Sequence, residues 1–262
     1  MAIRLLFFLV IMVVSCPAVV SAQMSLNNSD LTYQTGQGTK VLEIDPSTLV
    51  KVSGSDLSFL ALTDPSLLKD LKKDPGLYFF DRSGRLVAEY IGNDRFDPEM
   101  CYAASLSPDG KIIALDNGTW LVRAWVFFDF PGFKPIGPTD ESYINYLSDN
   151  EKADKNLTWV DGHTVIVTDI STTLVSRPCQ ADICEPLDVV IHDLANWKSQ
   201  ALAKGDELCD YTFDSLQNQT VLVNKTCVQK LEDWENVENA AALRRRTQER
   251  VSLPDSGARL DN

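Results

Sequence analysis

The chain has 262 residues and a formal net charge of -13, with 44% hydrophobic residues. That composition is typical of a folded globular protein. Such an acidic surface repels nucleic acid and anionic lipid, so neither is an expected partner, and we interpret the charge as a means of solubility in an extracytoplasmic space.

The first 22 residues have the pattern of a secretory signal. Arg4 precedes the apolar run Leu5–Val14, and small residues lead up to Ala22, where a signal peptidase would cut. The apolar run is shorter than the roughly 20 residues that a membrane-spanning helix needs. We therefore expect cleavage near Ala22, a secreted or periplasmic protein and no transmembrane segment.

A lipid anchor is the alternative for this segment. Val13-Val14-Ser15-Cys16 loosely resembles the bacterial lipobox. Pro17 follows the cysteine directly, and the signal-peptidase site lies six residues further on. We therefore favour cleavage over anchoring at Cys16.

The remaining chain is predicted to form one domain. No linker rich in Gly, Ser or Pro divides residues 23–253. Residues 254–262 are expected to be a disordered tail.

The first clear element is a short helix within residues 63–76. Asp64 is placed as its N-cap, Pro65 begins its first turn, and Pro75-Gly76 ends it. The next segment, Gly76–Gly92, predicts two strands joined through Asp81–Gly84.

The stretch Ser105–Val122 contains two turn signals in an apolar run. Pro108-Asp109-Gly110 predicts a tight turn, and Asn117-Gly118 predicts a two-residue hairpin turn. Three strands follow from these turns, at about 102–107, 111–116 and 119–130. The last has apolar residues on both faces, as expected for a strand packed between two neighbouring sheets.

The same strand and turn pattern recurs twice more. Asp161-Gly162 joins two strands within residues 156–169, and a third hairpin within residues 211–226 is expected to turn through a three-residue loop at 217–219. The turns centre near residues 109, 162 and 218. Units of about four antiparallel strands at this period predict a mostly β chain, a β-propeller-like array of about four or five blades.

Residues 231–251 predict a C-terminal helix. Leu231, Trp234 and Val237 recur at helical spacing, with acids early and Arg244–Arg246 late, as the helix dipole favours.

One motif carries a family resemblance. Ser105–Leu115, SLSPDGKIIAL, resembles the blade motif of TolB-like and WD40-like β-propeller repeats, in which a Ser-Pro-Asp-Gly-Lys turn joins the first two strands of a blade. The units around 162 and 218 keep the strand-turn-strand pattern without Ser-Pro. The resemblance implies an architecture and names no activity.

Five cysteines follow the signal, and in an exported chain they favour disulfides over metal ligands. Counting outward from the hairpin loop at 217–219 places Cys209 opposite Cys227, close enough for a bridge. Cys179 and Cys184, in a loop flanked by prolines, form the second expected pair. Cys101 is left as a buried thiol or an intermolecular partner.

Catalytic and metal-binding signals are weak. His163 and His192 are not spaced with another ligand, and a structural role is favoured for both. The sequence has no nucleophile elbow, phosphate loop or dinucleotide fingerprint. Four carboxylates are expected at strand ends or turns, where they serve either as turn formers or as ligands and acids of a propeller channel: Asp116, Asp161, Asp169 and Asp193.

Two function classes follow. The first, which we favour, is a non-enzymatic binding or scaffold protein that holds a protein, peptide or glycan on a propeller-like surface. The second is a hydrolase of the propeller lactonase type, with a divalent ion such as calcium held by carboxylates in the central channel. We expect no catalytic, cofactor-binding or metal-ligating residue for the first class, and converging carboxylates for the second.

Overall fold

The computed structural model describes residues 24–27, 30–35, 38–71, 73–91, 96, 98–118, 123–138, 143–146, 157–171, 185–235 and 240–254. The expected signal segment, the pair Cys179 and Cys184, and the tail after residue 254 lie outside these ranges. Within the described residues, no helix combines the length and the apolar character needed to cross a membrane.

A three-stranded antiparallel sheet, here called the N-terminal sheet, begins the described chain. Its strands are β1 (Met24–Asn27), β2 (Asp30–Thr35) and β3 (Gly38–Glu43). Side chains alternate between the two faces of a strand, so Met24 and Leu26 lie on one buried face with Leu31 and Tyr33. The 3-10 helix η1 (Pro46–Thr48) then leads into the first unit.

Three four-stranded antiparallel meanders and one three-stranded sheet follow. The first unit is β4 (Leu49–Ser53), β5 (Ser58–Leu62), β6 (Gly76–Phe80) and β7 (Leu86–Ile91). The second unit is β8 (Ala104–Leu106), β9 (Ile112–Gly118), β10 (Arg123–Asp129) and β11 (Tyr143–Tyr146), preceded by η2 (Pro98–Met100).

The third and fourth units complete the series. The third is β12 (Leu157–Trp159), β13 (Thr164–Ile170), β14 (Leu187–Asp193) and β15 (Lys198–Ala203), and the fourth is β16 (Cys209–Gln217), β17 (Thr220–Cys227) and β18 (Arg245–Ser252). The first strands of the four units begin at residues 49, 104, 157 and 209, so the expected repeat is present in the strand pattern.

The first and second units share one sheet. β4 and β8 pair in parallel, with Val52 opposite Ala104 and Ser53 opposite Ser105, and this joins eight strands in the order β11-β10-β9-β8-β4-β5-β6-β7. Gly54 follows β4 with a φ of 76°, and a Cβ there would lie 2.8 Å from the Leu106 carbonyl oxygen. The chain passes this close to its neighbour because glycine has no side chain.

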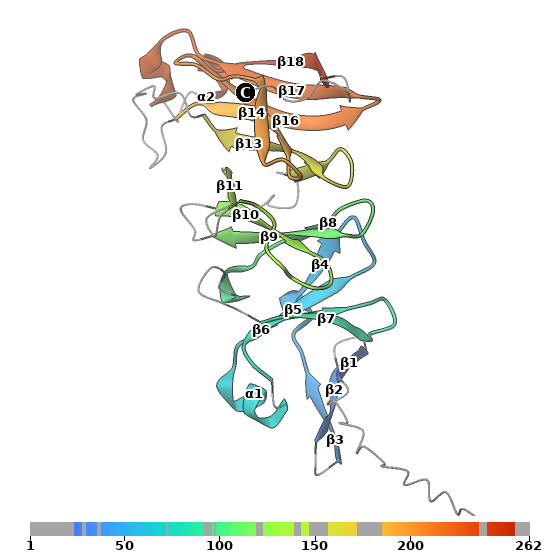
Figure 1. Cartoon of the computed structure of the whole chain (residues 1–262). Coiled ribbons are helices and arrows are strands. Elements are labelled where there is room, and N and C mark those ends of the chain that lie inside the picture. Colours follow the sequence, from blue (N-terminus) through green and yellow to red (C-terminus); the bar gives the residue numbers. More distant parts are fainter. Residues whose placement is uncertain are drawn as a thin grey trace, which may run out of the picture.

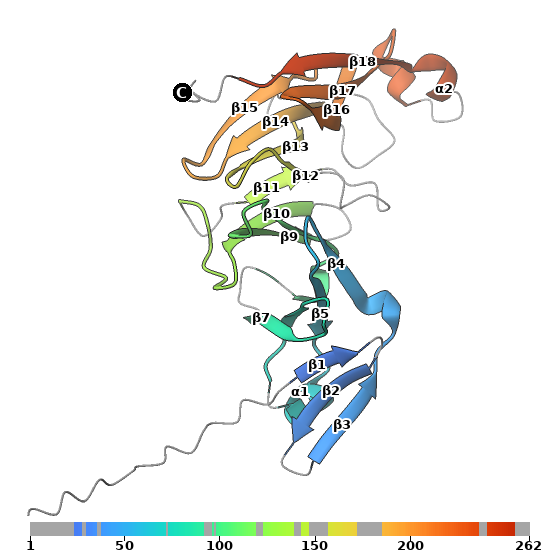
Figure 2. The same cartoon turned by 90° about the vertical axis from the view of Figure 1, so that its right-hand side faces the viewer.

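The sheets follow one another along a curved line, with the N-terminal sheet at one end and the fourth unit at the other (Figures 1 and 2). A separate hydrophobic core fills the contact between the N-terminal sheet and the first unit, and another fills each contact between successive units. The strand β10 shows why: Val126 and Phe128 pack toward the first unit, while Trp125 and Phe127 pack toward the third. The expectation of two apolar faces is confirmed for this strand.

The outer face of the fourth unit is polar. Asp214 accepts hydrogen bonds from the amides of Asn224 at 3.3 Å and Gln248 at 3.2 Å. Val221, Val223 and Val251 point the other way, toward the third unit. A polar last face is what an array of stacked repeats needs at its end.

The inserted helix is confirmed. α1 spans Pro65–Leu71, and the Asp64 carboxylate accepts the backbone N–H groups of Ser66 at 2.7 Å and Leu67 at 3.3 Å. Leu68 and Leu71 are buried against the N-terminal sheet and the first unit.

The expected C-terminal helix is wrong. Residues 231–234 form the 3-10 helix η4, α2 covers only Ala240–Leu243, and Arg245–Ser252 is the strand β18. β18 pairs with β17 along its whole length. Backbone pairing with what would otherwise be an exposed sheet edge outweighs the helical spacing of a few apolar residues.

Two expected turns also differ. β9 and β10 remain paired as far as Gly118 opposite Arg123, so the chain does not reverse at Asn117-Gly118. In the fourth unit the turn has two residues, Asn218 and Gln219, both with positive φ, the geometry that matches the twist of a hairpin.

Candidate functional site

Two hollows lie where the second unit packs against the third. The smaller, of about 250 Å³, is lined by β11, by the ends of β13 and β14, and by the start of β15. The larger, of about 540 Å³, is lined by the loop after β10, by His163 and by the turn between β14 and β15. Leu194 and Trp197 line both hollows, so they form the wall between them.

Trp197 is held in an unusual backbone conformation. Its φ is 51°, in the left-handed region that bulky residues rarely adopt. The ring lies edge-to-face with Phe127, at 6.2 Å between centroids and 78° between planes, and packs against the core between the second and third units. Strained backbone of this kind persists only where its surroundings fix it, and it concentrates at functional sites.

His192 contributes a ring nitrogen without a hydrogen-bond partner to the smaller hollow. Its Nε2 atom is buried and has no hydrogen-bond partner within the described part of the chain. Burial lowers the pKa of the imidazole to about 4, because the charged form would be removed from water. The ring is therefore neutral at physiological pH, and its Nε2 atom is left to hydrogen-bond with a ligand in the hollow, as donor or acceptor according to the tautomer.

Asp169 contributes a carboxylate to the same hollow. Burial raises its pKa to about 6, and the neighbouring charge of Asp188 adds to the rise. Asp188 is its cross-strand partner and accepts the Gly205 N–H at 2.7 Å. Asp169 is mostly ionised near neutral pH and becomes protonated a little below it.

His192 and Asp169 stand at opposite ends of the smaller hollow. The strand partner of Asp169 is Asp188, four residues from His192 along β14. At about 3.3 Å per residue this places the two positions about 13 Å apart. They are too far apart for direct proton exchange, and the hollow is elongated along β14.

Two of the other aspartates predicted from the sequence, Asp193 and Asp161, lie in turns beside the hollows. Asp193 lines the smaller hollow and accepts the backbone N–H of Ala195 at 2.9 Å, so it fixes the turn that carries Trp197. Asp161 accepts the backbone N–H of His163 at 2.8 Å and caps the turn beside the larger hollow. Both confirm the reading of these aspartates as turn formers.

Asp116 lies elsewhere. It is fully buried in β9, 3.4 Å from Arg123 Nη1, and Arg123 in turn lies over the Tyr102 ring at 4.9 Å. Neither charged group lines either of the two hollows at Trp197. Among the described residues, no three His, Cys, Asp or Glu side chains gather as metal ligands would.

The structure contains the expected disulfide between Cys209 and Cys227, which lie opposite each other on β16 and β17. Cys101 is buried with a free thiol, and burial raises its pKa well above the usual value. The proposed bridge between Cys179 and Cys184 lies outside the described residues.

Trp197 is not among the residues predicted from the sequence. The available signal is a tryptophan among the turn-forming residues of DLANWKS, Asp193–Ser199, between two strand-like runs. A large aromatic residue in a polar turn is unusual unless it packs against, or is presented by, a neighbouring element.

No protein-family model matches the chain, and no curated protein matches it in sequence. Among solved structures, Kuenenia stuttgartiensis hydrazine synthase is similar at 10% identity and a TM-score of 0.40, over 89% of this chain and 60% of that one. TolB from Acinetobacter baumannii is similar at 13% identity and a TM-score of 0.26, over 88% of this chain and 64% of that one. Both contain β-propeller domains, and the similarity to each is distant.

Proposed function

We propose that this chain is an exported, non-enzymatic binding protein that holds a glycan at the junction of its second and third units. In this proposal the four units are propeller-like blades arranged as an open array. The observation that carries it is Trp197, an indole in a strained turn that forms the wall between two hollows.

The chemistry of the walls favours a sugar chain. The apolar face of a pyranose ring packs on an indole, and its hydroxyl groups need acceptors beside that ring. Asp169 offers such an acceptor in the smaller hollow, where His192 Nε2 is a further group without a partner, while Asp129 and His163 line the larger one. Mixed apolar and polar walls of this kind are typical of ligand sites.

Export supports the same assignment. The signal-like residues 1–22 and the disulfide Cys209–Cys227 fit an oxidising extracytoplasmic compartment, where glycans are common partners. The net charge of -13 favours a neutral sugar over an anionic polymer.

A glycan array probed with the mature, oxidised protein tests the proposal. We expect binding to a subset of neutral oligosaccharides, and Trp197→Leu should weaken it by about fivefold or more, since packing of a sugar ring on the indole contributes about 1 kcal/mol or more. Trp234→Phe is the matched control, because Trp234 packs in the fourth-unit region, where its Nε1 donates to the Glu207 carbonyl at 3.1 Å. Binding confined to peptides, or glycan binding unchanged in Trp197→Leu, would overturn the assignment.

The effect of calcium on thermal stability distinguishes the binding protein from the alternative, a metal-dependent hydrolase. An ion-free binding protein should unfold at the same temperature in calcium and in chelator. A large calcium-dependent rise would show a specific site in the folded state and would favour the metal-dependent enzyme instead.

A further inference from the structure

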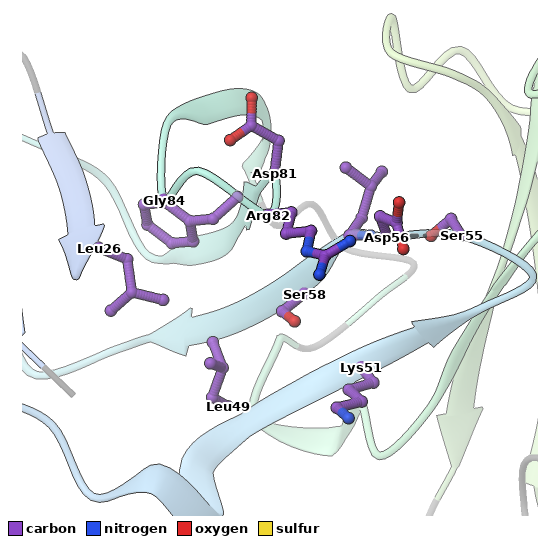
Figure 3. A pocket seen from close by; sticks show the side chains of 11 residues that line it. Leu26, Leu49, Lys51, Ser55, Asp56, Ser58, Asp81, Arg82 and Gly84 are labelled. Carbon is purple, nitrogen blue, oxygen red and sulfur yellow. Dashed lines mark hydrogen bonds between the residues drawn. The ribbon is translucent and has the colours of Figure 1, made fainter. Parts of the chain in front are cut away.

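A third hollow lies at the other end of the array, between the N-terminal sheet and the first unit. It has a volume of about 410 Å³ and is lined by β1, by β4 and the loop after it, and by the turn between β6 and β7 (Figure 3). It shares no residue with the two hollows at Trp197. Hollows at the contact between two packed bodies of a protein are common ligand sites.

The hollow is preformed, because the turn after β6 is fixed to β1. The Leu26 N–H donates to the Gly84 carbonyl at 2.7 Å, and Ser25 forms a β-bridge with Arg85. Gly84 has a φ of 79°, and a Cβ at this position would lie 1.5 Å from the Leu26 carbonyl oxygen. The two bodies therefore meet through backbone contacts that leave no room for a side chain at Gly84.

Two cationic side chains line this hollow without a partner. Lys51 lies on β4, and Arg82 extends from its turn over the strand that carries Ser58, toward Asp56 (Figure 3). Neither cation forms a hydrogen bond or an ion pair within the described part of the chain. Both are exposed, in a protein with 37 acidic and 24 basic residues.

The acidic residues of the hollow are not equivalent. Asp81 is committed to its own turn, where it accepts the Ser83 N–H at 2.9 Å and the Arg85 Nε at 3.2 Å. Asp56 has no partner within the described residues. With Asp81 paired to Arg85, the hollow retains an excess of one positive charge from Lys51, Arg82 and Asp56.

Part of the lining is apolar. Leu26, Leu49, Leu57 and Phe80 line the hollow beside the charged groups. An occupant that satisfies both parts needs an anionic head and an apolar body. We propose that this hollow is a second binding site, which takes a small organic carboxylate with its head between Lys51 and Arg82 and its apolar body against Leu26, Leu49 and Phe80.

Calorimetric titration of the mature, oxidised protein with hexanoate tests this site. The titration is run at low ionic strength, since salt screens exposed charges. We expect hexanoate to bind, hexylammonium not to bind, and inorganic phosphate to bind more weakly than hexanoate because it gains nothing from the apolar wall. No binding of hexanoate, or equal binding of phosphate, would overturn the proposal.

Charge variants locate the site. Lys51→Gln and Arg82→Gln should each weaken hexanoate binding by about fivefold, while Lys204→Gln, an exposed cation that does not line this hollow, should leave it unchanged. Asp56→Asn should tighten binding by about two- to fivefold, because it removes a negative charge beside the head. All four side chains are solvent-accessible, so the variants should fold, which their melting temperatures check.

Hexanoate binding that persists in the double variant Lys51→Gln/Arg82→Gln would place the ligand elsewhere and reject the site. Trp197→Leu should bind hexanoate as the unaltered chain does, so the outcome here is independent of the glycan proposal.

Discussion

The second unit meets its two neighbours in different ways. Toward the first unit, the β4–β8 pair continues the hydrogen-bonded sheet, and Phe59, Phe79 and Tyr90 fill the core beside it. Toward the third unit the described strands belong to separate sheets, and Trp159 Nε1 reaches across to Ser105 Oγ at 3.0 Å. The hollows at Trp197 lie only at this second junction.

The difference shows where a repeat array has room for function. A continuous sheet fixes the spacing of its strands at about 4.8 Å, which leaves no space between units at the paired strands. Units that meet through side chains alone can separate locally while each sheet keeps its own backbone hydrogen bonds. We therefore expect the first junction to be the more costly to alter and the second to be the more tolerant.

The largest expected effect is at the first junction. Phe79→Ala removes a fully buried ring that contacts Phe59 at 5.5 Å and Phe133 at 5.3 Å between centroids. The cavity should lower the free energy of unfolding by about 3–5 kcal/mol. Urea denaturation followed by circular dichroism measures this, and Trp197→Leu, at the second junction, should cost less than half as much because Trp197 is only partly buried. Equal costs would contradict the comparison.

At the second junction one substitution should stabilise the protein. Asp169 has its pKa raised from 3.8 to about 6, so folding disfavours its charge. Asp169→Asn should raise the free energy of unfolding by up to about 3 kcal/mol above pH 6, and the gain should disappear as the pH falls toward 3.8, where the carboxyl is neutral in both states. Chemical denaturation at pH 7.5 and pH 4 checks this.

His192→Gln is the control, because its effect on stability should appear at low pH, where the effect of Asp169→Asn disappears. Its pKa is lowered from 6.5 to about 4, so the buried ring costs nothing above pH 6.5, and its cost grows as the pH falls toward 4. His192→Gln should therefore stabilise the protein at pH 4 more than at pH 7.5. The same pH profile for both variants would show that burial at this junction is not the cause.

A glycine pair tests the close approach at the first junction. Gly54 and Gly110 have similar φ values, 76° and 72°, but only Gly54 lies within 4 Å of another chain segment at its missing Cβ. Gly110→Ala should cost about 1 kcal/mol for the backbone conformation alone, and Gly54→Ala about 2 kcal/mol or more. Thermal unfolding of the two variants gives the difference, and equal melting temperatures would rule out a steric role for Gly54.

The smallest effect concerns the bond across the second junction. Trp159→Phe keeps a ring in place but removes the donor to Ser105, and should cost about 1 kcal/mol. A double-mutant cycle with Ser105→Ala isolates the bond, and a coupling energy near zero would mean that packing alone joins these units.

The sequence predicts several local elements of this fold, although not the pairing past Asn117-Gly118 or the length of the turn in the fourth unit. The turn at Pro108-Asp109-Gly110, the capped helix after Asp64 and the disulfide Cys209–Cys227 are each specified by residues close together in the chain. The repeat is visible for the same reason, because each unit carries its own turn signal.

Contacts between strands that are far apart in the sequence cannot be predicted from local patterns in this way. β18 is a strand because β17 offers it an edge, and nothing within Arg245–Ser252 reports that edge. The candidate site depends on the same kind of information: Asp169 lies on β13 and Trp197 in the turn between β14 and β15, and their shared hollow forms only when β11 packs against the third unit. No local pattern encodes that packing.

The hairpin of the fourth unit contains a pair of compensating irregularities. The turn is one residue shorter than the sequence predicts, and a bulge between Phe213 and Ser215 takes up the extra residue. Only the two together bring Cys209 opposite Cys227. The hairpin should therefore accept many substitutions but no single insertion or deletion, because a shift of one residue would turn alternate side chains to the wrong face and separate the cysteines. In a lineage of such chains, the length of this turn and the presence of the bulge at Asp214 should change together or not at all.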